Sequence, residues 1–276
     1  MTQVPNVTLN TGAKIPQIGY GVFLIPAEEV VEPVAAALRA GYRSIDTASA
    51  YGNEEGVGRA IAESGIPRDE LFITTKLWND DQGYDSTLRA FDASIGKLGL
   101  DYVDLYLIHW PTPAADKFVE TWKAFERLHA DGRIKSIGVS NFQIPHLRRL
   151  FEETDVVPAL NQVELHPRFQ QRDLRAFHAE HDIVTEAWSP LGRNSGLFDD
   201  PLLTSLAEKY DKTPAQIMLR WHVQLGNVAI PKSATPERIA KNIEVFDFEL
   251  ADDDVKGIEA LETGERIGPD PDTFGG

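Results

Sequence analysis

The chain has 276 residues, of which 42% are apolar and 25% charged, so it can bury a large core and shows no compositional sign of disorder. Its formal charge of -16 argues against a nucleic-acid partner and against an anionic membrane, both of which require a basic surface. The absence of cysteine excludes disulfides and cysteine zinc sites, and no apolar run approaches the ~18 to 20 residues that span a bilayer. We therefore expect a soluble cytoplasmic protein.

Hydrophobic periodicity predicts a regular alternation of strand and helix. Residues 7–15 are typical of a hairpin that could plug the bottom of a barrel, and Gln17 to Gly21 is taken as the first strand. Further strands are predicted at residues 42–45, 71–75, 103–108, 134–139, 159–163, 183–188 and 228–230. Helices are predicted near residues 30–38, 54–63, 86–98, 117–130, 144–152, 171–180, 201–225, 236–245 and 252–261.

Eight strand–helix units with near-continuous apolar strands indicate parallel strands covered by helices. We expect an α/β fold, a (β/α)8 TIM barrel with an N-terminal β-hairpin and an extra C-terminal helix, in one domain over residues 1–276. The competing open sheet would carry a Gly-x-Gly-x-x-Gly turn after its first strand. Here Gly19 and Gly21 are present, but Leu24 stands at the third position.

Polar side chains follow seven consecutive predicted strands. They are Asp46, Lys76, His109, Ser140 with Asn141, Gln162 with Glu164, Trp188 with Ser189, and Lys232 with Ser233. Any one of them could be ordinary loop polarity. Because barrel active sites form at the carboxyl ends of the strands, a carboxylate, an ammonium and an imidazole on adjacent strands would share one pocket. The set therefore indicates a functional site.

Tyr51 follows the first of these strand ends and adds a phenol. A phenol with a pKa near ~10 is a poor acid at neutral pH unless a nearby cation stabilises its phenolate. Lys76 could be that cation, and Asp46 could keep it charged and oriented. His109 could donate a hydrogen bond to a substrate oxygen or help to protonate Tyr51. These residues predict a proton donor assembled around a carbonyl oxygen.

Seven ordered blocks of the chain resemble the aldo-keto reductase family. They cover residues 41–48, 51–54, 73–78, 104–111, 137–142, 161–167 and 230–233, within a resemblance that runs from about residue 7 to 250. The likeness is closest to the bacterial 2,5-diketo-D-gluconate reductase type, from residues 78–80 and 110–116. The resemblance implies a barrel reductase that uses a nicotinamide cofactor, with Tyr51 as proton donor, Lys76 and Asp46 tuning it, and His109 orienting the carbonyl.

A hydroxyl, two amides and an indole could form a shelf for the nicotinamide. Ser140, Asn141 and Gln162 suit a carboxamide, which needs both donors and acceptors, and Trp188 offers a flat face for the ring. The family resemblance assigns these residues to the nicotinamide. It also implies cofactor contacts at Ser189, Leu191, Lys232, Ser233, Arg238 and Asn242.

The last unit combines a helix start with a basic cluster. Thr235 and Pro236 are typical of an N-cap and the first helical position. Lys232, Arg238 and Lys241 would then gather at the positive end of the helix, and we place Asn242 on the same face as Arg238 and Lys241, opposite Ile239 and Ile243. The cluster is either a solvated basic face or an anion site. The family uses these positions for the adenosine 2′-phosphate, which implies NADP(H).

Phe23, Trp78 and Trp110 lie near strand ends and are candidate substrate contacts. The loops at residues 78–84 and 189–200 and the tail from Gly264 are candidate lids, and two aspartates in the tail would disfavour anionic substrates. His-x-His and His-Glu-x-x-His are absent, so we expect no metal site. The expected partner is a small-molecule carbonyl substrate, either a 2,5-diketo sugar acid or a small dicarbonyl, and the resemblance favours a monomer.

Two other functions remain open at this level. A class I aldolase on the same barrel would use Lys76 or Lys232 as a Schiff-base lysine, but it leaves Trp188 and the basic cluster unexplained. A non-catalytic cofactor-binding protein on the reductase scaffold is the second alternative. The presence of all four residues of the predicted catalytic tetrad, Asp46, Tyr51, Lys76 and His109, argues against it.

Overall fold

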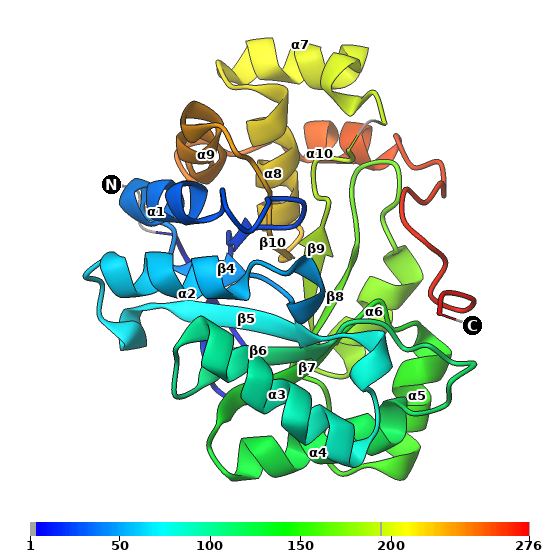
Figure 1. Ribbon diagram of the computed structural model, residues 1–276. Coiled ribbons are helices and arrows are strands. Elements are labelled where there is room, and N and C mark those ends of the chain that lie inside the picture. Colours follow the sequence, from blue (N-terminus) through cyan, green and yellow to red (C-terminus); the bar gives the residue numbers. More distant parts are fainter. Residues whose placement is uncertain (1–3, 194, 276) are drawn as a thin grey trace.

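Eight parallel strands form a barrel surrounded by helices in the computed structural model, which describes residues 4–193 and 195–275 (Figure 1). The barrel strands are β3 (Tyr20–Gly21), β4 (Ser44–Asp46), β5 (Phe72–Leu77), β6 (Val103–Ile108), β7 (Ile134–Ser140), β8 (Leu160–Glu164), β9 (Val184–Trp188) and β10 (Val228–Ala229). They pair in sequence order from β3 to β10. The predicted α/β barrel is confirmed.

Ten α-helices follow the strands. They are α1 (Val31–Ala40), α2 (Glu54–Glu63), α3 (Tyr84–Leu98), α4 (Phe118–Ala130), α5 (Ile144–Glu153), α6 (Arg172–Glu180), α7 (Pro201–Tyr210), α8 (Pro214–Gln224), α9 (Pro236–Ile243) and α10 (Asp252–Glu259) in the described part of the chain. Four short 3-10 turns join them there: η1 (Ser49–Tyr51), η2 (Arg68–Glu70), η3 (Asn79–Asp81) and η4 (Leu197–Asp199). None of the described helices is long and apolar enough to cross a membrane.

The first strand is shorter than predicted because its residues divide their hydrogen bonds between two neighbours. Only Tyr20 and Gly21 pair with β4, whereas Ile18 bridges to Ala229 and the Gly19 amide donates to the Ala229 carbonyl at 2.9 Å. These contacts close the barrel. A side chain on Gly21 would bring its Cβ to 3.1 Å from the Ile230 carbonyl oxygen, so the glycines permit closure rather than form a nucleotide-binding turn.

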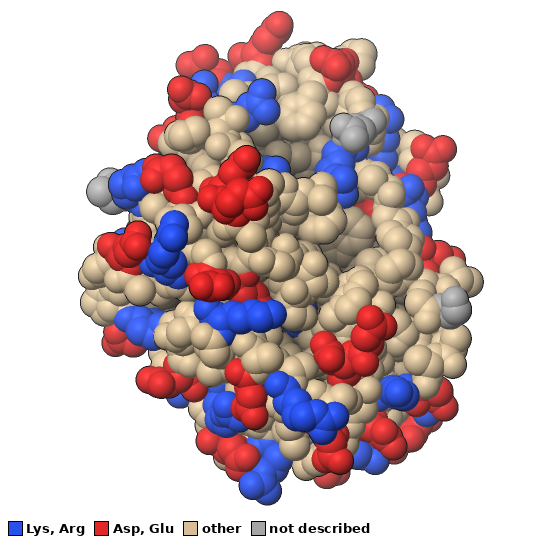
Figure 2. All heavy atoms as spheres, in the orientation of Figure 1, with Lys and Arg blue, Asp and Glu red and all other residues tan. Residues whose placement is uncertain are grey.

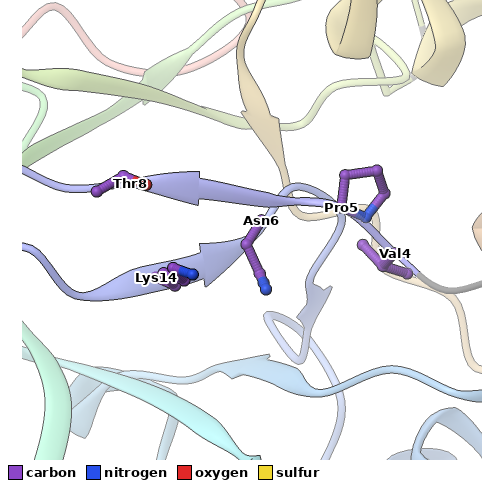
Figure 3. Close-up of a pocket in the computed structure, with 5 residues that line it drawn as sticks. All are labelled: Val4, Pro5, Asn6, Thr8 and Lys14. Atoms are coloured by element: carbon purple, nitrogen blue, oxygen red, sulfur yellow. The ribbon is translucent and has the colours of Figure 1, made fainter.

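An antiparallel hairpin, β1 (Asn6–Thr8) with β2 (Lys14–Pro16), covers the amino-terminal end of the barrel. Its buried Leu9 and Ile15 belong to one apolar cluster with residues on or beside the barrel strands, Phe72, Leu105, Leu107, Ala159, Leu160 and Val228. This is the plug expected from the sequence. A hollow of about 470 Å³ beside the hairpin is lined by Val4, Pro5, Asn6, Thr8 and Lys14 (Figure 3). It lies at the end of the barrel away from the polar strand ends.

The alternation of side chains along β5 explains how a charged residue lies at the carboxyl end of a strand whose start is apolar. Phe72 belongs to the apolar cluster under the hairpin, and Lys76, four residues further along the same side of the strand, is fully buried at the carboxyl end. Ile73 and Leu77 point to the other side and belong to the larger cluster between strands and helices. One strand therefore carries an apolar barrel floor and a buried cation at its top.

The single helix predicted over residues 201–225 is wrong: α7 and α8 are separate helices. Asp211 ends the first in the left-handed conformation, with φ 52°. Thr213 then caps α8 through a reciprocal capping box with Gln216, and Pro214 takes the first helical position. A proline there cannot continue the previous helix. Because α8 is the helix that leads directly into β10, α7 is an extra helix between β9 and β10 that does not belong to the eightfold pattern.

Candidate active site

Tyr51 lies in the η1 turn directly after β4, over the carboxyl end of the barrel. Gly52 ends the turn in the left-handed conformation, with φ 68°, which glycine adopts without strain. The Ser49 hydroxyl donates to the Lys76 carbonyl at 2.9 Å and fastens the turn to β5. The sequence Ser-Ala-Tyr-Gly therefore holds the phenol beside the next strand.

Asn53 fixes the same turn to the loop after β3, a role that sequence reasoning missed. Its side-chain amide donates to the carbonyls of Val22 at 3.1 Å and Ile25 at 3.0 Å, and it is buried. The ring of Phe23, in that loop, lies 5.0 Å from the ring of Tyr51. Asn53 thus couples the position of a candidate substrate contact to the position of the phenol.

Lys76 joins the tetrad through three contacts of its ammonium group. Its Nζ donates to Asp46 Oδ1 at 2.6 Å, to the Thr47 carbonyl at 2.9 Å and to the Tyr51 hydroxyl at 3.4 Å. Its side chain is 0% exposed. All three donors are used, so the geometry fixes the cation directly beside the phenol.

Burial and charge set the protonation states of this group. Burial, the largest single effect, lowers the pKa of Lys76, but the charge and hydrogen bond of Asp46 together with Tyr51 and Glu186 outweigh it and raise that pKa, so the amine stays charged. Burial raises the pKa of Tyr51, and the Lys76 charge opposes that rise. At neutral pH the site therefore holds a neutral phenol beside a fixed ammonium, which is the arrangement of a proton donor.

His109 follows β6 and faces the phenol. Its ring lies 5.7 Å from that of Tyr51 and 5.2 Å from that of Trp78. Burial, with the charge of Lys76, lowers the pKa of His109 well below its ordinary value, so the imidazole is neutral. A neutral imidazole has one N–H and can donate one hydrogen bond to a substrate oxygen.

The predicted nicotinamide shelf is a continuous hydrogen-bonded row. The Trp188 indole donates to Asn141 Oδ1 at 2.8 Å, and the Asn141 amide donates to the His109 carbonyl at 2.9 Å and to Ser140 Oγ at 3.1 Å. The Ser140 hydroxyl donates to the Gln162 carbonyl at 2.8 Å. The structure therefore brings the four shelf residues together beside the tetrad.

One shelf residue and the residue after another have left-handed backbones. Asn141 follows β7 with φ 64°, and Ser189 follows β9 with φ 48°. This conformation is unfavourable for Ser, and strain of this kind is concentrated at functional sites. Ser189 and Leu191 are both half-buried and continue the shelf into the loop after β9. The backbone turns sharply here so that side chains reach the mouth of the barrel.

Glu186 adds a buried carboxyl that sequence reasoning did not single out, because it lies inside the strand. Gln162 Nε2 donates to Asp46 Oδ2 and to Glu186 Oε2, both at 2.8 Å. Burial, with the negative charge of Asp46, raises the pKa of Glu186 to about 8. At pH 7 Glu186 is therefore mainly the neutral acid.

The raised pKa of Glu186 makes stability depend on pH. Between the ordinary pKa of 4.5 and about 8 the folded state holds a proton that the unfolded state has lost, so this stabilisation is present at low pH and disappears as pH rises to about 8. We expect the free energy of unfolding to fall by up to about 1 kcal/mol per pH unit more in the wild type than in Glu186→Gln. Urea denaturation between pH 5 and 8.5 measures the free energy of unfolding of both proteins. If it changes with pH equally in the two proteins, the prediction is contradicted.

The basic cluster lies only in part at the start of α9: Lys232 precedes the helix and Arg238 lies near its start, whereas Lys241 lies in its last turn and not at its N-terminus as predicted. Lys232, Arg238 and Lys241 are exposed, and no ion pair links any of them to an acidic residue in the described part of the chain. Ser233 is buried, at 8% exposed. Acidic and basic side chains are otherwise interspersed over the face in Figure 2, which is hollowed near its centre. Lys232 and Arg238, which have no carboxylate partner among the described residues, lie at the N-terminus of α9 and suit an anionic ligand.

Two further details of this helix differ from the prediction. Asn242 is only 6% exposed and lies with Ile239 and Ile243 against the protein, not on the open face of Arg238. Its position on the helix is about 300° from Ile239, at the edge of the buried stripe. Thr235 is the N-cap residue, but its side chain makes no capping bond; the Ser233 hydroxyl instead accepts from the Thr235 amide at 3.1 Å.

Aromatic rings lie beside the tetrad. Beside Phe23 and Trp78, Trp110 is 7% exposed and packs against Phe274, with ring centroids 4.4 Å apart. Phe274 also lies 6.5 Å from Trp78. It belongs to the C-terminal tail and was missed because nothing in the local sequence indicates where the tail lies. The predicted substrate contacts are therefore near the tetrad, with one ring added from the tail.

The tail is fastened to the barrel by Glu164 at the end of β8. Its carboxylate accepts from the backbone amides of Ile267 at 2.6 Å and Gly268 at 2.8 Å, and from His166 at 3.0 Å. These hydrogen bonds lower the pKa of Glu164 although burial opposes the shift. A Cβ on Gly268 would lie 2.5 Å from the Trp188 ring. The tail, red in Figure 1, therefore contacts the shelf directly.

A (β/α)8 barrel that holds a phenol beside a buried ammonium, a row of amide side chains and an exposed basic cluster fits a cofactor-dependent oxidoreductase. The chain belongs to the aldo/keto reductase family, whose model matches residues 17–263. It is 62% identical over 270 residues, 98% of each chain, to an aldo-keto reductase of Mycolicibacterium smegmatis, and 55% identical over 271 residues, again 98% of each, to the methylglyoxal reductase DkgA of Escherichia coli.

A solved structure agrees with the cofactor chemistry of the site. A point mutant of Gox0644 in complex with NADPH superposes with a TM-score of 0.95 at 49% identity, covering 99% of each chain. The protein is an oxidoreductase that uses NADP(H). The hydroxyl and amide groups of the shelf and the uncompensated cations near α9 fit a nicotinamide carboxamide and a phosphate respectively.

Proposed function

We propose that this protein reduces a small aldehyde or ketone to the alcohol, with Tyr51 as the proton donor. The observation that carries the proposal is the Tyr51 hydroxyl 3.4 Å from a buried Lys76 ammonium, which is itself 2.6 Å from Asp46. Bound NADPH would supply the hydride. The phenol transfers its proton to the substrate oxygen as negative charge develops there, and the ammonium stabilises the phenolate that is left.

The neighbouring residues orient the reactants. His109, held neutral, donates a hydrogen bond to the same substrate oxygen and so directs it toward Tyr51. Ser140, Asn141 and Gln162 hold the carboxamide, and Trp188 stacks on the ring, so that one face of the nicotinamide meets the carbonyl carbon. Phe23, Trp78 and Trp110 exclude water from the reacting atoms.

We propose that Arg238 and Lys232 bind the 2′-phosphate of NADPH. Replacing Arg238 by Ala should weaken NADPH binding by roughly 10- to 150-fold and leave NADH binding nearly unchanged, because a charge-assisted contact contributes about 1.5–3 kcal/mol. Fluorescence titration with both cofactors measures the effect. Arg39→Ala, which removes an exposed arginine paired with Glu32, is the matched control. Equal losses for the two cofactors would contradict the assignment.

Small dicarbonyls are the substrate class that we favour. The aromatic wall of Phe23, Trp78, Trp110 and Phe274 is apolar and lies close to the phenol, which suits a compact substrate. The similarity to a methylglyoxal reductase supports the same class. Asp270 and Asp272 in the tail add negative charge, which disfavours the diketo sugar acid.

The aldolase alternative requires a neutral lysine that can attack a carbonyl. Lys76 is fully buried, donates to three oxygens and has a raised pKa, so it is a poor nucleophile. Lys232 is exposed and is not one of the residues that form the aromatic wall. These observations favour the reductase.

The test is NADPH oxidation over a panel of methylglyoxal, other dicarbonyls, simple aldehydes and a 2,5-diketo sugar acid, with identification of the alcohol product. We expect the highest kcat/KM for the small dicarbonyls. Binding of NADPH without turnover of any carbonyl would favour the non-catalytic alternative. We also propose that the protein acts as a monomer in the cytoplasm, on the basis of the family resemblance and the strongly negative charge of -16.

A further inference from the structure

Glu186 and Asp46 hold the side chain of Gln162 from two sides. Gln162 lies on β8, Glu186 on the neighbouring β9, and Asp46 across the barrel on β4. The single nitrogen Nε2 of Gln162 donates one hydrogen bond to each carboxyl, at 2.8 Å in both cases. Both N–H groups of the amide are thereby used, and its carbonyl oxygen is the group that remains for another partner.

The two carboxyls also determine which way round the amide sits. If the amide were flipped, its oxygen would face the carboxylate of Asp46 and the two acceptors would repel each other. One hydrogen bond alone would leave the amide free to turn about the N–H···O axis. The second hydrogen bond, to Glu186, fixes the plane of the amide.

Burial makes this arrangement costly to disturb. Gln162 is 2% exposed, Asp46 2% and Glu186 1%. Lys76 is the one cation among the described groups whose charge affects the pKa of Glu186. If Asp46 and Glu186 were both ionised, this single cation would compensate their two negative charges poorly. The pKa of Glu186, raised to about 8, allows it to accept the hydrogen bond at pH 7 without adding a second charge.

We propose that Glu186 is a positioning residue for the cofactor. By fixing the plane of the Gln162 side-chain amide, it aims the side-chain oxygen Oε1 of Gln162 at the N–H of the nicotinamide carboxamide. The inference rests on the proposed cofactor contact of Gln162. Glu186 itself contacts neither substrate nor cofactor, and its effect passes through one hydrogen bond. Its removal should therefore affect recognition of the carboxamide more than the fold.

A cofactor analogue isolates that hydrogen bond. In reduced 3-acetylpyridine adenine dinucleotide phosphate a methyl group replaces the carboxamide nitrogen, so the analogue cannot donate to Gln162. We expect the wild type to bind NADPH roughly three- to tenfold more tightly than the analogue, the contribution of one hydrogen bond. In Glu186→Leu this ratio should fall to about 1, and in Glu186→Gln, whose carbonyl oxygen still accepts from Gln162, it should stay at the wild-type value.

Thr185→Val is the matched control on the same strand. Thr185 points out of the barrel, where its hydroxyl hydrogen-bonds His178 at 2.8 Å, so the variant removes a buried contact of β9 without touching Gln162. It should keep the wild-type ratio. A Glu186→Leu protein that binds NADPH and still discriminates against the analogue as the wild type does would overturn the proposal.

A second measurement holds even if Glu186→Leu does not fold. The side-chain ¹⁵N amide signal of Gln162 in the wild type should shift between pH 6 and 9.5 as Glu186 loses its proton, and the shift should be absent in Glu186→Gln. Asp46, Lys76 and Tyr51, the other titratable groups near Glu186, are unchanged in that variant. An identical response in both proteins would overturn the proposal.

Neither readout requires turnover. If the wild type reduces no carbonyl but shows the ratio and the pH-dependent shift, the proposed function is wrong and the role of Glu186 stands. If the wild type reduces carbonyls but shows neither effect, the role of Glu186 is wrong and the proposed function stands.

Discussion

Replacing Tyr51 by Phe should lower kcat for carbonyl reduction by about 10²- to 10⁴-fold, the usual contribution of a positioned general acid. The phenyl ring keeps the 5.0 Å contact with Phe23 but has no proton to give. Among the described residues the Tyr51 hydroxyl hydrogen-bonds only Lys76, at 3.4 Å, so the free energy of unfolding should change by less than about 1 kcal/mol. Steady-state kinetics and urea denaturation on the same preparation separate the two effects.

Tyr106→Phe is the matched control for that experiment. Tyr106 is fully buried between β6 and the helices, and its hydroxyl has no hydrogen-bond partner among the described residues. Loss of this hydroxyl should leave kcat unchanged and should not lower stability. Turnover that survives undiminished in Tyr51→Phe would refute the proposed proton donor, whereas equal losses in both variants would indicate a packing effect.

Much of the fold could be predicted because the spacing of apolar residues alternates regularly between a strand pattern and a helix pattern. The strands are continuous apolar runs and the helices have an amphipathic period, so eight units were countable without coordinates. The predicted boundaries are wrong where a tertiary contact or a helix cap ends an element within a continuous hydrophobic pattern. Residues 17–19 are lost from the first strand because they turn to pair with Ala229, and Thr213 with Pro214 divides a pattern that looks like one helix.

The tetrad was predictable because each residue lies at or shortly after the carboxyl end of a strand, and those positions converge in a barrel. Glu186 was not, because a carboxyl inside a strand resembles a surface position until the strand is known to curve around a polar interior. Asn53 and Phe274 depend on contacts with segments 28 and 164 residues away in the sequence, counted from Ile25 and Trp110, and no local pattern records such distances.

Replacing Lys76 by Met should have the largest effect on stability. The variant removes the ammonium group that is 2.6 Å from Asp46 and leaves a buried carboxylate without its cation. Removing one partner of a buried ion pair costs about 3–5 kcal/mol, which is a large part of the total stability of a domain. Reduction should also be lost, because the Lys76 charge is what opposes the rise in the pKa of Tyr51. Urea denaturation and NADPH oxidation at pH 7 measure the two losses.

The cause of that instability can be separated from the loss of activity. If the cost arises from uncompensated negative charge, the double variant Asp46→Asn, Lys76→Met should recover at least half of the lost stability, since an amide in place of the carboxylate needs no counterion. Lowering the pH from 8 to 5 should also stabilise Lys76→Met, because a protonated Asp46 is neutral. Activity should return in neither case, since no cation then stabilises the phenolate. A double variant whose stability loss equals the sum of the two single losses would show that Lys76 and Asp46 contribute independently, contrary to the coupled pair described above.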